Sequence, residues 1–382
     1  MKIVVIGAGP AGSYVSYLLS KSGHDVELYE EHNEIGVPIQ CTGLLSSEFK
    51  KFEIFHDLPS NISNVFIVNK FNEIVLNSPG VKVELSQEEF LVNRAKFDSY
   101  LANLALEAGT KIFISHHFIK KSVNDKKEES LLIKDKNNNE IKKVGYDIVI
   151  GADGPLSSVA KEFSFNTKHR KYYHGVQAVI KGNFNPNCYY TYFGNNVCPD
   201  FFGWVVPESK THARVGIASK NNVKKYFNNF IEKYCRDFNF EFEGESIKFQ
   251  SAIIPIYSSK QKFQKGKCYL IGDSAAQVKA TTLGGIIPSF KAAHILVDSI
   301  NNNFCYNKQL RKLRRGLKVH LLARNIFDKI NDNDLNKLFY LVKQDKVQKV
   351  LKKYSRDNPV PLFVNLILKE PRFVLFAKYL FN

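Results

Sequence analysis

Hydrophobic residues near the start of the chain form one continuous run and then recur at helical spacing. Residues 3–6 (IVVI) are β-branched, as is typical of a strand that is buried on both faces. A glycine turn and a helix beginning after Pro10 follow, and residues 25–29 (DVELY) have the pattern of a second strand. This order predicts the strand, helix and strand with which a parallel sheet begins.

Two later segments repeat the change from an apolar strand to a glycine-containing turn and a helix. They are residues 146–162 (YDIVIGADGPLSSVAKE) and residues 266–300, which begin with GKCYLIGDSAAQ. Each of these strands is expected to end at the carboxyl edge of the sheet, where open α/β sheets bind their ligands. An amphipathic helix is predicted at residues 93–109.

The middle of the chain has a different pattern. Residues 189–207 (YYTYFGNNVCPDFFGWVVP) alternate aromatic and small residues and include the only tryptophan of the protein. The alternation predicts a sheet that packs one face against something large and apolar. From the pattern alone, an ordinary β-sheet core is the alternative.

The composition of the 382 residues is that of a globular protein, with 44% hydrophobic and 24% charged residues. No stretch reaches the roughly 18 uncharged apolar residues of a membrane-spanning helix. The best candidate, 361–381, is interrupted by the charged and proline residues of 369–372 (KEPR). The six cysteines lack CxxC or His-paired spacing, which argues against a metal site and a disulfide framework and favours a reducing cytoplasm. A single disulfide stays compatible with the sequence.

The net charge of +17 is concentrated near the end of the chain. Residues 304–382 hold 18 Lys and Arg against 6 Asp and Glu. Such a segment is either a solvated helical face or a contact surface for an anionic membrane. Nucleic acid is disfavoured, because no helix-turn-helix, zinc-finger or RNA-binding signature accompanies the charge. Residues 308–327 (KQLRKLRRGLKVHLLARNIF) mix basic and apolar residues at helical spacing, which predicts a helix lying in a membrane interface.

Gly7, Gly9 and Gly12 form a GxGxxG turn between the first strand and the first helix. Their small size allows a tight turn, the approach of a pyrophosphate and close packing of helix on strand. The N-terminus of the helix then attracts the phosphates. Glu30 ends the second strand at the distance expected of a ribose-binding carboxylate. The motif predicts a dinucleotide without distinguishing FAD from NAD.

Three motifs in order resemble those of the FAD-dependent family that includes p-hydroxybenzoate hydroxylase. They are the GxGxxG turn, the pair Asp153–Gly154 and the pair Gly272–Asp273, with Arg94 ahead of the amphipathic helix as a fourth element. The resemblance implies FAD as the cofactor. It implies cofactor contacts at Gly7, Gly9, Ala11, Gly12, Glu30, Cys41, Arg94, Asp153, Gly154, Gly272, Asp273, Gly284, Gly285 and Ile286.

Two other segments resemble the geranylgeranyl reductase family, which includes the digeranylgeranylglycerophospholipid reductases. Residues 36–46 (GVPIQCTGLLS) contain its PxxCxG motif. Residues 202–216 have the spacing of its lipid-site pattern, Tyr-x-Trp-x-Phe-Pro, seven residues, then Val-Gly, with phenylalanine in place of the tyrosine and valine in place of the phenylalanine. Leu283 also departs from a glycine triplet frequent in the family. The implied substrate-binding residues are Pro38, Gly43, Phe202, Trp204, Val206, Pro207 and Gly216.

The resemblance implies a reductase that saturates C=C bonds of geranylgeranyl chains, on archaeal-type membrane glycerophospholipids, by hydride transfer from reduced FAD. Such an enzyme is expected at the cytoplasmic face of the membrane, bound peripherally. NADPH, ferredoxin or another reduced carrier would supply electrons, because FAD takes the only dinucleotide fingerprint. Cys41 has two interpretations, a catalytic proton donor to the alkene or a small residue that shapes the pocket.

Two alternative functions stay open. The first is a flavin monooxygenase of the aromatic hydroxylase type that acts on a small apolar substrate, for which Gln40 and Thr42 would be the polar groups of the loop. The second is a membrane-associated flavoprotein without catalysis. A flavin halogenase is disfavoured, because no WxWxIP-like segment is present.

The expected fold combines α/β and α+β architecture. It consists of a discontinuous Rossmann-like FAD-binding domain, an inserted, mainly antiparallel β substrate domain and a helical C-terminal region. The predicted FAD-binding domain comprises residues 1–60, 91–170 and 262–303, and the substrate domain comprises residues 61–90 and 171–261. Residues 304–382 form the basic helical region.

Overall fold

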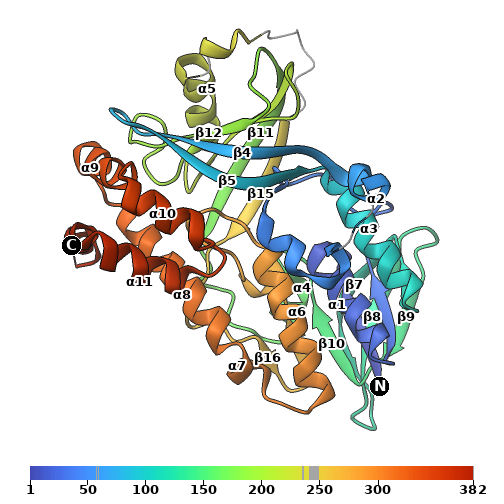
Figure 1. Ribbon diagram of the computed structural model, residues 1–382. Helices are drawn as coiled ribbons and strands as arrows, with labels where there is room; N and C mark the ends of the chain where they lie inside the picture. Colours follow the sequence, from blue (N-terminus) through green and yellow to red (C-terminus); the bar gives the residue numbers. More distant parts are fainter. Residues whose placement is uncertain (57, 59, 235, 241–248, 382) are drawn as a thin grey trace. The chain divides into compact units, whose positions relative to one another are not determined.

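The computed structural model describes residues 1–56, 58, 60–234, 236–240 and 249–381. Contacts between Cα atoms divide the chain into two units. The first unit consists of residues 1–39, 94–171 and 255–318, and the second of residues 40–93, 172–254 and 319–382. Helices and sheets occur in both units (Figure 1), which confirms the predicted mixed α/β and α+β class.

The first unit is built on a six-stranded sheet in the order β16-β17-β10-β1-β2-β6. Its strands are β1 (Lys2–Ile6), β2 (Asp25–Tyr29), β6 (Lys111–Phe113), β10 (Ile148–Gly151), β16 (Gln264–Lys265) and β17 (Cys268–Leu270). All pairs from β17 to β6 are parallel, and β16 is antiparallel to β17. The strand order reverses between β1 and β10, which is the position where doubly wound sheets bind nucleotides.

Three helices of the first unit pack together. Helix α1 (Pro10–Lys21) packs against α3 (Arg94–Glu107) and α6 (Ile286–Asn301). The other elements of this unit are α4 (Ser158–Glu162), η5 (Gly272–Ala275), α7 (Tyr306–Gln309) and an antiparallel sheet of β7 (His116–Val123), β8 (Glu129–Asp135) and β9 (Ile141–Gly145). Helix α8 (Arg311–Phe327) continues from the first unit into the second.

The second unit contains an eight-stranded sheet in the order β15-β11-β14-β13-β12-β4-β5-β3. Its strands are β3 (Leu44–Ser46), β4 (Ile67–Asn77), β5 (Lys82–Val92), β11 (Tyr172–Lys181), β12 (Cys188–Tyr192), β13 (Gly203–Pro207), β14 (His212–Ser219) and β15 (Phe249–Pro255). The pairing of β12 with β4 is parallel, whereas the pairs β11–β14, β13–β14, β12–β13, β4–β5 and β3–β5 are antiparallel.

Helices cover both faces of this sheet (Figure 1). Helix α5 (Val223–Tyr234) lies on the face to which Gly203 points, because a Cβ at Gly203 would touch the ring of Phe230. Val206 points to the other face and shares a core with Leu335 and Phe339. The elements of the second unit beyond β-structure are η1 (Ser47–Lys51), η2 (Glu53–Phe55), α2 (Ser60–Phe66), α5, η3 (Arg236–Phe238), α9 (Asp332–Val342), α10 (Asp345–Lys353), α11 (Pro359–Lys369) and η6 (Pro371–Leu380).

The boundaries of the two units differ from those that the sequence predicts. The prediction places residues 40–60 in the FAD-binding domain, whereas the structure places them in the second unit. The reason is long-range pairing, because Leu44 and Leu45 lie opposite Leu91 and Phe90 at the edge of the large sheet. Residues 319–382 also belong to the second unit, since α9 and η6 contribute side chains to its core.

Three properties concern the described part of the chain as a whole. None of its helices combines the length and apolar character needed to cross a bilayer. No group of His, Cys, Asp and Glu side chains within it could hold a metal ion. Its five cysteines, at positions 41, 188, 198, 268 and 305, are all free, and Cys235 lies outside the described residues.

Candidate functional site

The glycine turn after β1 has the close contacts that its sequence predicts. Gly7 has φ +101°, and a Cβ on it would lie 2.5 Å from the carbonyl oxygen of Ala152. A Cβ on Gly12 would lie 1.8 Å from the carbonyl oxygen of Gly7. A Cβ on Gly9 would meet no atom within 4 Å. The first and third glycines therefore hold helix, strand and neighbouring turn together, and the second leaves open space in front of the backbone.

Helix α1 begins at this open space. Its N-cap is Gly9, Pro10 occupies the first turn, and no acidic residue lies in that turn. The first N–H groups of a helix lack partners within the helix and carry a partial positive charge. The turn can therefore hold an anionic group such as a pyrophosphate.

Glu30 follows β2 and is almost fully buried. Its Oε2 accepts a hydrogen bond from the N–H of Ala8 at 2.8 Å. Its Oε1 accepts one from the N–H of His32 at 3.0 Å and lies 2.6 Å from the Nδ1 of the same residue. The carboxylate is thus held at the edge of the glycine turn, where a ribose would bind.

Asp153 follows β10, and its carboxylate is directed to the start of α4. Oδ1 accepts a hydrogen bond from the hydroxyl of Ser157 at 2.6 Å, and Oδ2 accepts one from the N–H of Val159 at 3.0 Å. Ser157 is itself the N-cap of α4 and accepts from the N–H of Ala160. Burial raises the pKa of Asp153 despite these hydrogen bonds. The carboxylate therefore stabilises the helix start that follows the turn.

Asp273 differs from the other two acids. No described residue donates a hydrogen bond to its carboxylate, although Arg94 and Arg170 are close enough to interact with its charge. Desolvation outweighs these arginines and raises the pKa of Asp273 to about 6. Gly285 packs against the carboxylate, because a Cβ there would lie 2.9 Å from its Oδ1. Of the three acids, Asp273 has the most unused capacity to accept hydrogen bonds from a sugar hydroxyl.

The segment after β17 is adjacent to the glycine turn. Gly272 has φ +69°, and a Cβ on it would lie 2.8 Å from the Cβ of Ala11 in the first turn of α1. Gly285 is the N-cap of α6, which begins at Ile286 and has no acidic residue in its first turn. Leu283, in place of the glycine expected from the resemblance, has φ +55°. A left-handed backbone is costly for leucine and not for glycine, which accounts for the glycine preference at this position.

Two arginines complete this region. Arg94 makes a bidentate ion pair with Asp98, with Nε–Oδ1 at 2.9 Å and Nη2–Oδ2 at 2.8 Å. Arg170, which the sequence analysis missed, donates hydrogen bonds to the carbonyl oxygens of Ser274 at 2.5 Å and Pro155 at 3.3 Å. It therefore links the Asp153 turn to the Asp273 turn. No local sequence pattern distinguishes such an arginine from a surface charge.

The PxxCxG segment passes from one unit to the other. Val37, Pro38 and Ile39 belong to the first unit, with a cis peptide bond before Pro38, and residues from Gln40 onward belong to the second. Cys41 is partly buried, and its thiol accepts a hydrogen bond from the N–H of Gly43 at 3.3 Å. The thiol therefore supports the turn that leads into β3.

Two buried polar side chains hold this turn against the sheet, and the sequence analysis missed both. Arg214 donates from Nη1 to the carbonyl oxygens of Thr42 and of Val92, the latter at 3.0 Å, and its Nε is 2.6 Å from Glu208. Gln177 accepts a hydrogen bond from the hydroxyl of Thr42 at 2.7 Å. A single charged residue within the apolar run ARVGIA was the available signal for Arg214.

Trp204 and Gly216 of the lipid-site pattern are opposite each other on β13 and β14. A Cβ on Gly216 would lie 2.4 Å from Cζ2 of the indole ring. The glycine therefore makes room for the tryptophan to lie across the sheet. The indole Nε1 is buried and has no hydrogen-bond partner among the described residues. Such an unpaired donor is a cost to the fold that a bound polar group would relieve.

The other residues of the pattern lie in an aromatic core. Phe202 stacks on Phe201, with ring centroids 4.2 Å apart, and contacts Phe193 at 4.9 Å. Val206 and Pro207 are buried. The structure thus places Phe202, Trp204, Val206, Pro207 and Gly216 in one region of the second unit.

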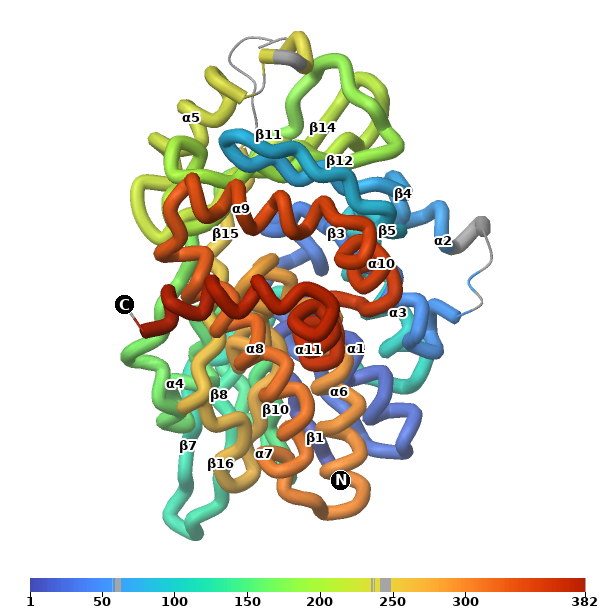
Figure 2. Tube along the Cα trace, turned by 60° about the vertical axis from the view of Figure 1, so that its left-hand side comes forward, coloured from blue at the N-terminus to red at the C-terminus, as the bar shows by residue number. Residues whose placement is uncertain are grey.

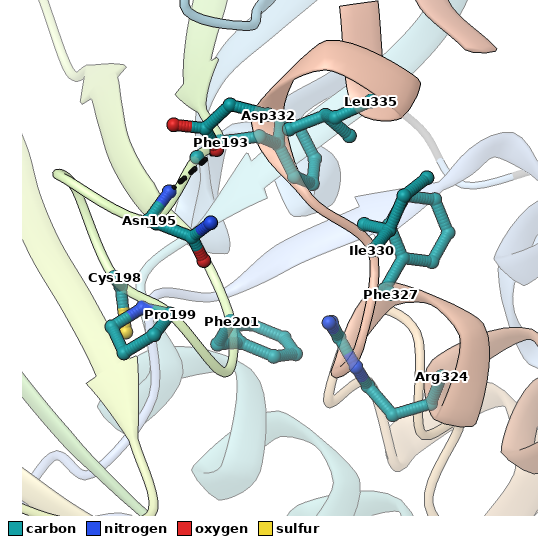
Figure 3. A pocket seen from close by; sticks show the side chains of 11 residues that line it. Phe193, Asn195, Cys198, Pro199, Phe201, Arg324, Phe327, Ile330, Asp332 and Leu335 are labelled. Carbon is teal, nitrogen blue, oxygen red and sulfur yellow. Dashed lines mark hydrogen bonds between the residues drawn. The ribbon is translucent and has the colours of Figure 1, made fainter. Parts of the chain in front are cut away.

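A small cavity lies beside this aromatic core (Figure 3). Phe193, Phe201 and Phe327 contribute to its wall, and the side chain of Arg324 points toward it. Its volume is about 10 Å³, close to that needed for one water molecule. A prenyl chain requires a much larger site, so this cavity is a packing defect of the aromatic core rather than a lipid pocket.

The residues of the first unit fit FAD. The open space before Gly9, the helix N-terminus at Pro10 and the unused acceptor of Asp273 provide places for a pyrophosphate and for sugar hydroxyls. All predicted cofactor-binding residues except Cys41 lie in this unit, and all predicted substrate-binding residues except Pro38 lie in the other.

Comparisons with known proteins agree with these observations. The family model described as "FAD binding domain" matches residues 1–296. The chain is 27% identical to the digeranylgeranylglycerophospholipid reductase of Methanosarcina acetivorans, with 91% of this chain and 89% of the relative covered. It is 28% identical to the reductase of the same name from Methanocaldococcus jannaschii, with 88% of this chain and 89% of that protein covered.

A solved structure supports the fold. The crystal structure of a geranylgeranyl bacteriochlorophyll reductase-like protein from Thermoplasma acidophilum superposes with a TM-score of 0.81 at 21% identity. The alignment covers 99% of this chain and 98% of that one. Together these findings confirm the predicted resemblance and FAD as the predicted cofactor.

Proposed function

The chain belongs to the family of FAD-binding domains, and on this premise we propose that it is a reductase that saturates C=C bonds in the geranylgeranyl chains of membrane glycerophospholipids. The observation that carries the proposal is the joint presence of a flavin-type site in the first unit, the lipid-site segment in the second, and the PxxCxG segment that runs from one to the other. The similarity to relatives named as digeranylgeranylglycerophospholipid reductases, which extends over about nine tenths of the chain, supports the proposal.

In this proposal the residues of the first unit bind and orient the cofactor. Bound FAD in its reduced form supplies the electron pair that an isolated alkene needs. The N–H groups at the start of α1 bind the pyrophosphate, and Glu30 and Asp273 accept hydrogen bonds from sugar hydroxyls. Asp153 and Arg170 act as positioning residues, because their polar atoms hold the turns themselves.

The second unit provides the apolar surface for the prenyl chain. The indole ring of Trp204 lies over Gly216, and the ring of Phe202 meets it edge-on with ring centroids 6.3 Å apart. This surface excludes water from the alkene, which keeps the reducing equivalents for the substrate. The absence of a tyrosine hydroxyl at position 202 and the shorter side chain of Val206 would alter the length of chain that fits.

Cys41 has a structural partner, which favours the role of a residue that shapes the substrate site. Its thiol already accepts a hydrogen bond from Gly43 and supports the turn held by Arg214. Cys41→Ser keeps an acceptor of hydrogen bonds at this position, whereas Cys41→Ala removes it. Near-normal turnover of both variants with reduced flavin would exclude a proton-donor role. A loss of about 100-fold or more in both, within the range of general acid catalysis, would establish that role instead.

The external donor of electrons is NADPH, ferredoxin or another reduced carrier in this proposal. The enzyme acts peripherally at the cytoplasmic face of the membrane, because complete extraction of a geranylgeranyl lipid into water is costly at about 0.8 kcal/mol for each CH₂ group.

Anaerobic incubation of the dithionite-reduced protein with a geranylgeranylated glycerolipid tests the proposal. Mass spectrometry should show a gain of hydrogen pairs in the lipid together with re-oxidation of the flavin. An unchanged lipid mass would contradict the proposed reaction, and lipid-stimulated consumption of oxygen in air would favour a monooxygenase in its place.

A further inference from the structure

The most exposed apolar residues of the second unit are concentrated near its C-terminus. On α11, Val360, Val364, Ile367 and Leu368 are 41%, 50%, 41% and 70% exposed. Their spacing places them on one face of the helix. An exposed apolar stripe of this kind on a helix that is otherwise packed marks an interaction surface.

The following segment extends this surface. In η6, Val374 and Leu375 are 54% and 68% exposed, and Phe381 directly after it is 88% exposed. Figure 2 shows α11 and the chain that follows it on the side of α9 and α10 away from β4 and β5. We use the name C-terminal apolar face for Val360, Val364, Ile367, Leu368, Val374, Leu375 and Phe381.

The backbone that carries this face is firmly attached to the second unit. Phe376 and Tyr379, on the opposite side of η6, are buried in the core beneath the large sheet. The hydroxyl of Tyr379 donates a hydrogen bond to Asp334 at 2.9 Å. The exposed apolar side chains are therefore held outward by a fixed support.

The exposed charges around this face are mostly basic, with Asp345 at the start of α10 as an exposed acid. Glu370 is the only acidic residue between positions 359 and 381. It is 1% exposed and is paired internally with Arg372 and Lys346. Lys369, Arg372 and Lys378 are exposed beside the apolar residues. Helix α10, which packs against α11, adds exposed lysines at positions 349, 352 and 353.

The basic helix predicted to lie in a membrane interface does not have this character. Among the apolar residues of α8, only Leu322 is exposed, and the others are buried or half-buried. Most of its basic residues are on the surface, although Arg324 is buried, and its apolar residues pack inward. The apolar and basic surface therefore comes from α11 and η6 and not from α8.

We propose that the C-terminal apolar face docks on an anionic lipid bilayer, with α11 lying in the plane of the interface and the surrounding lysines and Arg372 contacting lipid headgroups. The biological role of this docking rests on the proposed function, since docking would bring the protein to its lipid substrate. Apolar side chains that enter the acyl boundary and an excess of basic residues around them are what such binding requires.

Vesicle flotation tests the docking. The full-length protein is mixed with vesicles of equal parts phosphatidylcholine and phosphatidylglycerol, and with vesicles of phosphatidylcholine alone. We expect binding to the mixed vesicles that weakens with salt. The double variant Leu368→Ser with Leu375→Ser should lower the partition coefficient at least tenfold.

A matched control uses two equally exposed apolar residues of the first unit. Val123 and Ile141 are 53% and 59% exposed on the small antiparallel sheet. Val123→Ser with Ile141→Ser should leave vesicle binding unchanged. An equal loss of vesicle binding in both double variants would overturn the docking site. Equal binding of the original protein to vesicles with and without phosphatidylglycerol would also overturn it. Thermal unfolding of each variant shows whether a loss of binding comes from loss of the fold. The double variant Val360→Ser with Val364→Ser tests the same apolar face at a second place.

The same surface could instead bind a second copy of the chain, and sedimentation without lipid distinguishes the two. A dimer that dissociates in the Leu368→Ser, Leu375→Ser variant would overturn membrane docking. Reduction of a detergent-solubilised geranylgeranyl lipid is measured in parallel. The variant should keep this activity. If neither protein reduces the lipid while only the variant loses vesicle binding, the proposed reaction fails and the docking site stands.

Discussion

The two units carry their candidate sites by different physical means. In the first unit the site is formed mainly by the backbone: glycines that permit close approach, the N–H groups of a helix, and acids placed at strand ends. In the second unit the site is formed by the packing of large side chains, such as Trp204 across Gly216 and Phe202 on Phe201. A backbone site requires particular residues at fixed spacing, whereas a packed site tolerates exchange of one apolar residue for another.

This difference explains the departures from the family patterns. In the first unit the GxGxxG turn is intact, because a Cβ at Gly7 or Gly12 would overlap backbone atoms that cannot move aside. In the second unit Phe202 and Val206 replace tyrosine and phenylalanine of the pattern, and Phe202 still stacks on Phe201 while Val206 lies within the core. Gly216 matches the pattern, as Trp204 and Pro207 do, and a Cβ there would contact the indole ring of Trp204.

The same substitution, glycine to alanine, applied once in each unit is the strongest test of this comparison. Gly12→Ala would place a methyl group 1.8 Å from the carbonyl oxygen of Gly7. We expect the free energy of unfolding to fall by about 3 kcal/mol or more and FAD affinity to fall by at least about 100-fold. Flavin absorbance after gel filtration measures the loss. Full retention of FAD would show that the turn adapts and would contradict the backbone model.

Gly216→Ala tests the packed site, with a smaller expected effect. The new methyl group would lie 2.4 Å from the ring of Trp204, which can move because it is a side chain. We expect a loss of about 2 kcal/mol in stability, with FAD content unchanged. Trp204 is the only tryptophan, so intrinsic fluorescence reports this site alone. An unchanged emission spectrum, or loss of FAD from this variant, would contradict the separation of the two sites.

Asp273 provides a pH-dependent test within the backbone site. Its pKa is raised to about 6 in the folded protein, from about 3.9 in an unfolded chain. The folded state therefore binds the proton more tightly, and the contribution of this group to stability is present below pH 4 and is lost as the pH rises to 6. For the protein without FAD we expect a difference of about 1–2 kcal/mol between these limits, allowing for solvent screening.

The Asp273→Asn variant should lack this dependence. Urea unfolding gives the free energy of unfolding of each protein, and the difference between the two values should therefore change between pH 4 and pH 6. Parallel pH profiles for the two proteins would show that Asp273 titrates normally. A comparison is Asp153→Asn, which keeps only one of the two oxygens that accept hydrogen bonds from Ser157 and Val159 and should therefore be destabilised at neutral pH.

The sequence was sufficient for the features that depend on neighbouring residues. The β-branched run of β1, the glycine spacing and the acids at strand ends are local, and they predicted the fold class and the cofactor. The N-cap of α4 was also accessible, because Ser157 precedes the helix in a typical N-cap position.

Long-range contacts could not be predicted in this way. Residues 40–60 join the second unit because β3 pairs with β5, more than 40 residues along the chain. Helices α8 and α11 both have apolar residues at helical spacing, and tertiary packing decides that most of those of α8 are covered while several of those of α11 stay exposed. Arg170 and Arg214 acquire their positioning roles from carbonyl groups that distant turns bring close.

Leu283 gives the smallest expected effect and the finest test of the backbone site. It has φ +55°, where leucine is strained by about 1–2 kcal/mol, at a position for which the family pattern has glycine. Leu283→Gly removes this strain but raises the entropy of the unfolded chain, so we expect a net stabilisation of about 1 kcal/mol or less. Denaturant unfolding of the protein without FAD measures it, and Leu317→Gly in the middle of α8 is a control that should be clearly destabilising. A destabilised Leu283→Gly variant would mean that side-chain contacts of Leu283 outweigh its backbone strain, and that even this turn of the first unit depends on side-chain packing.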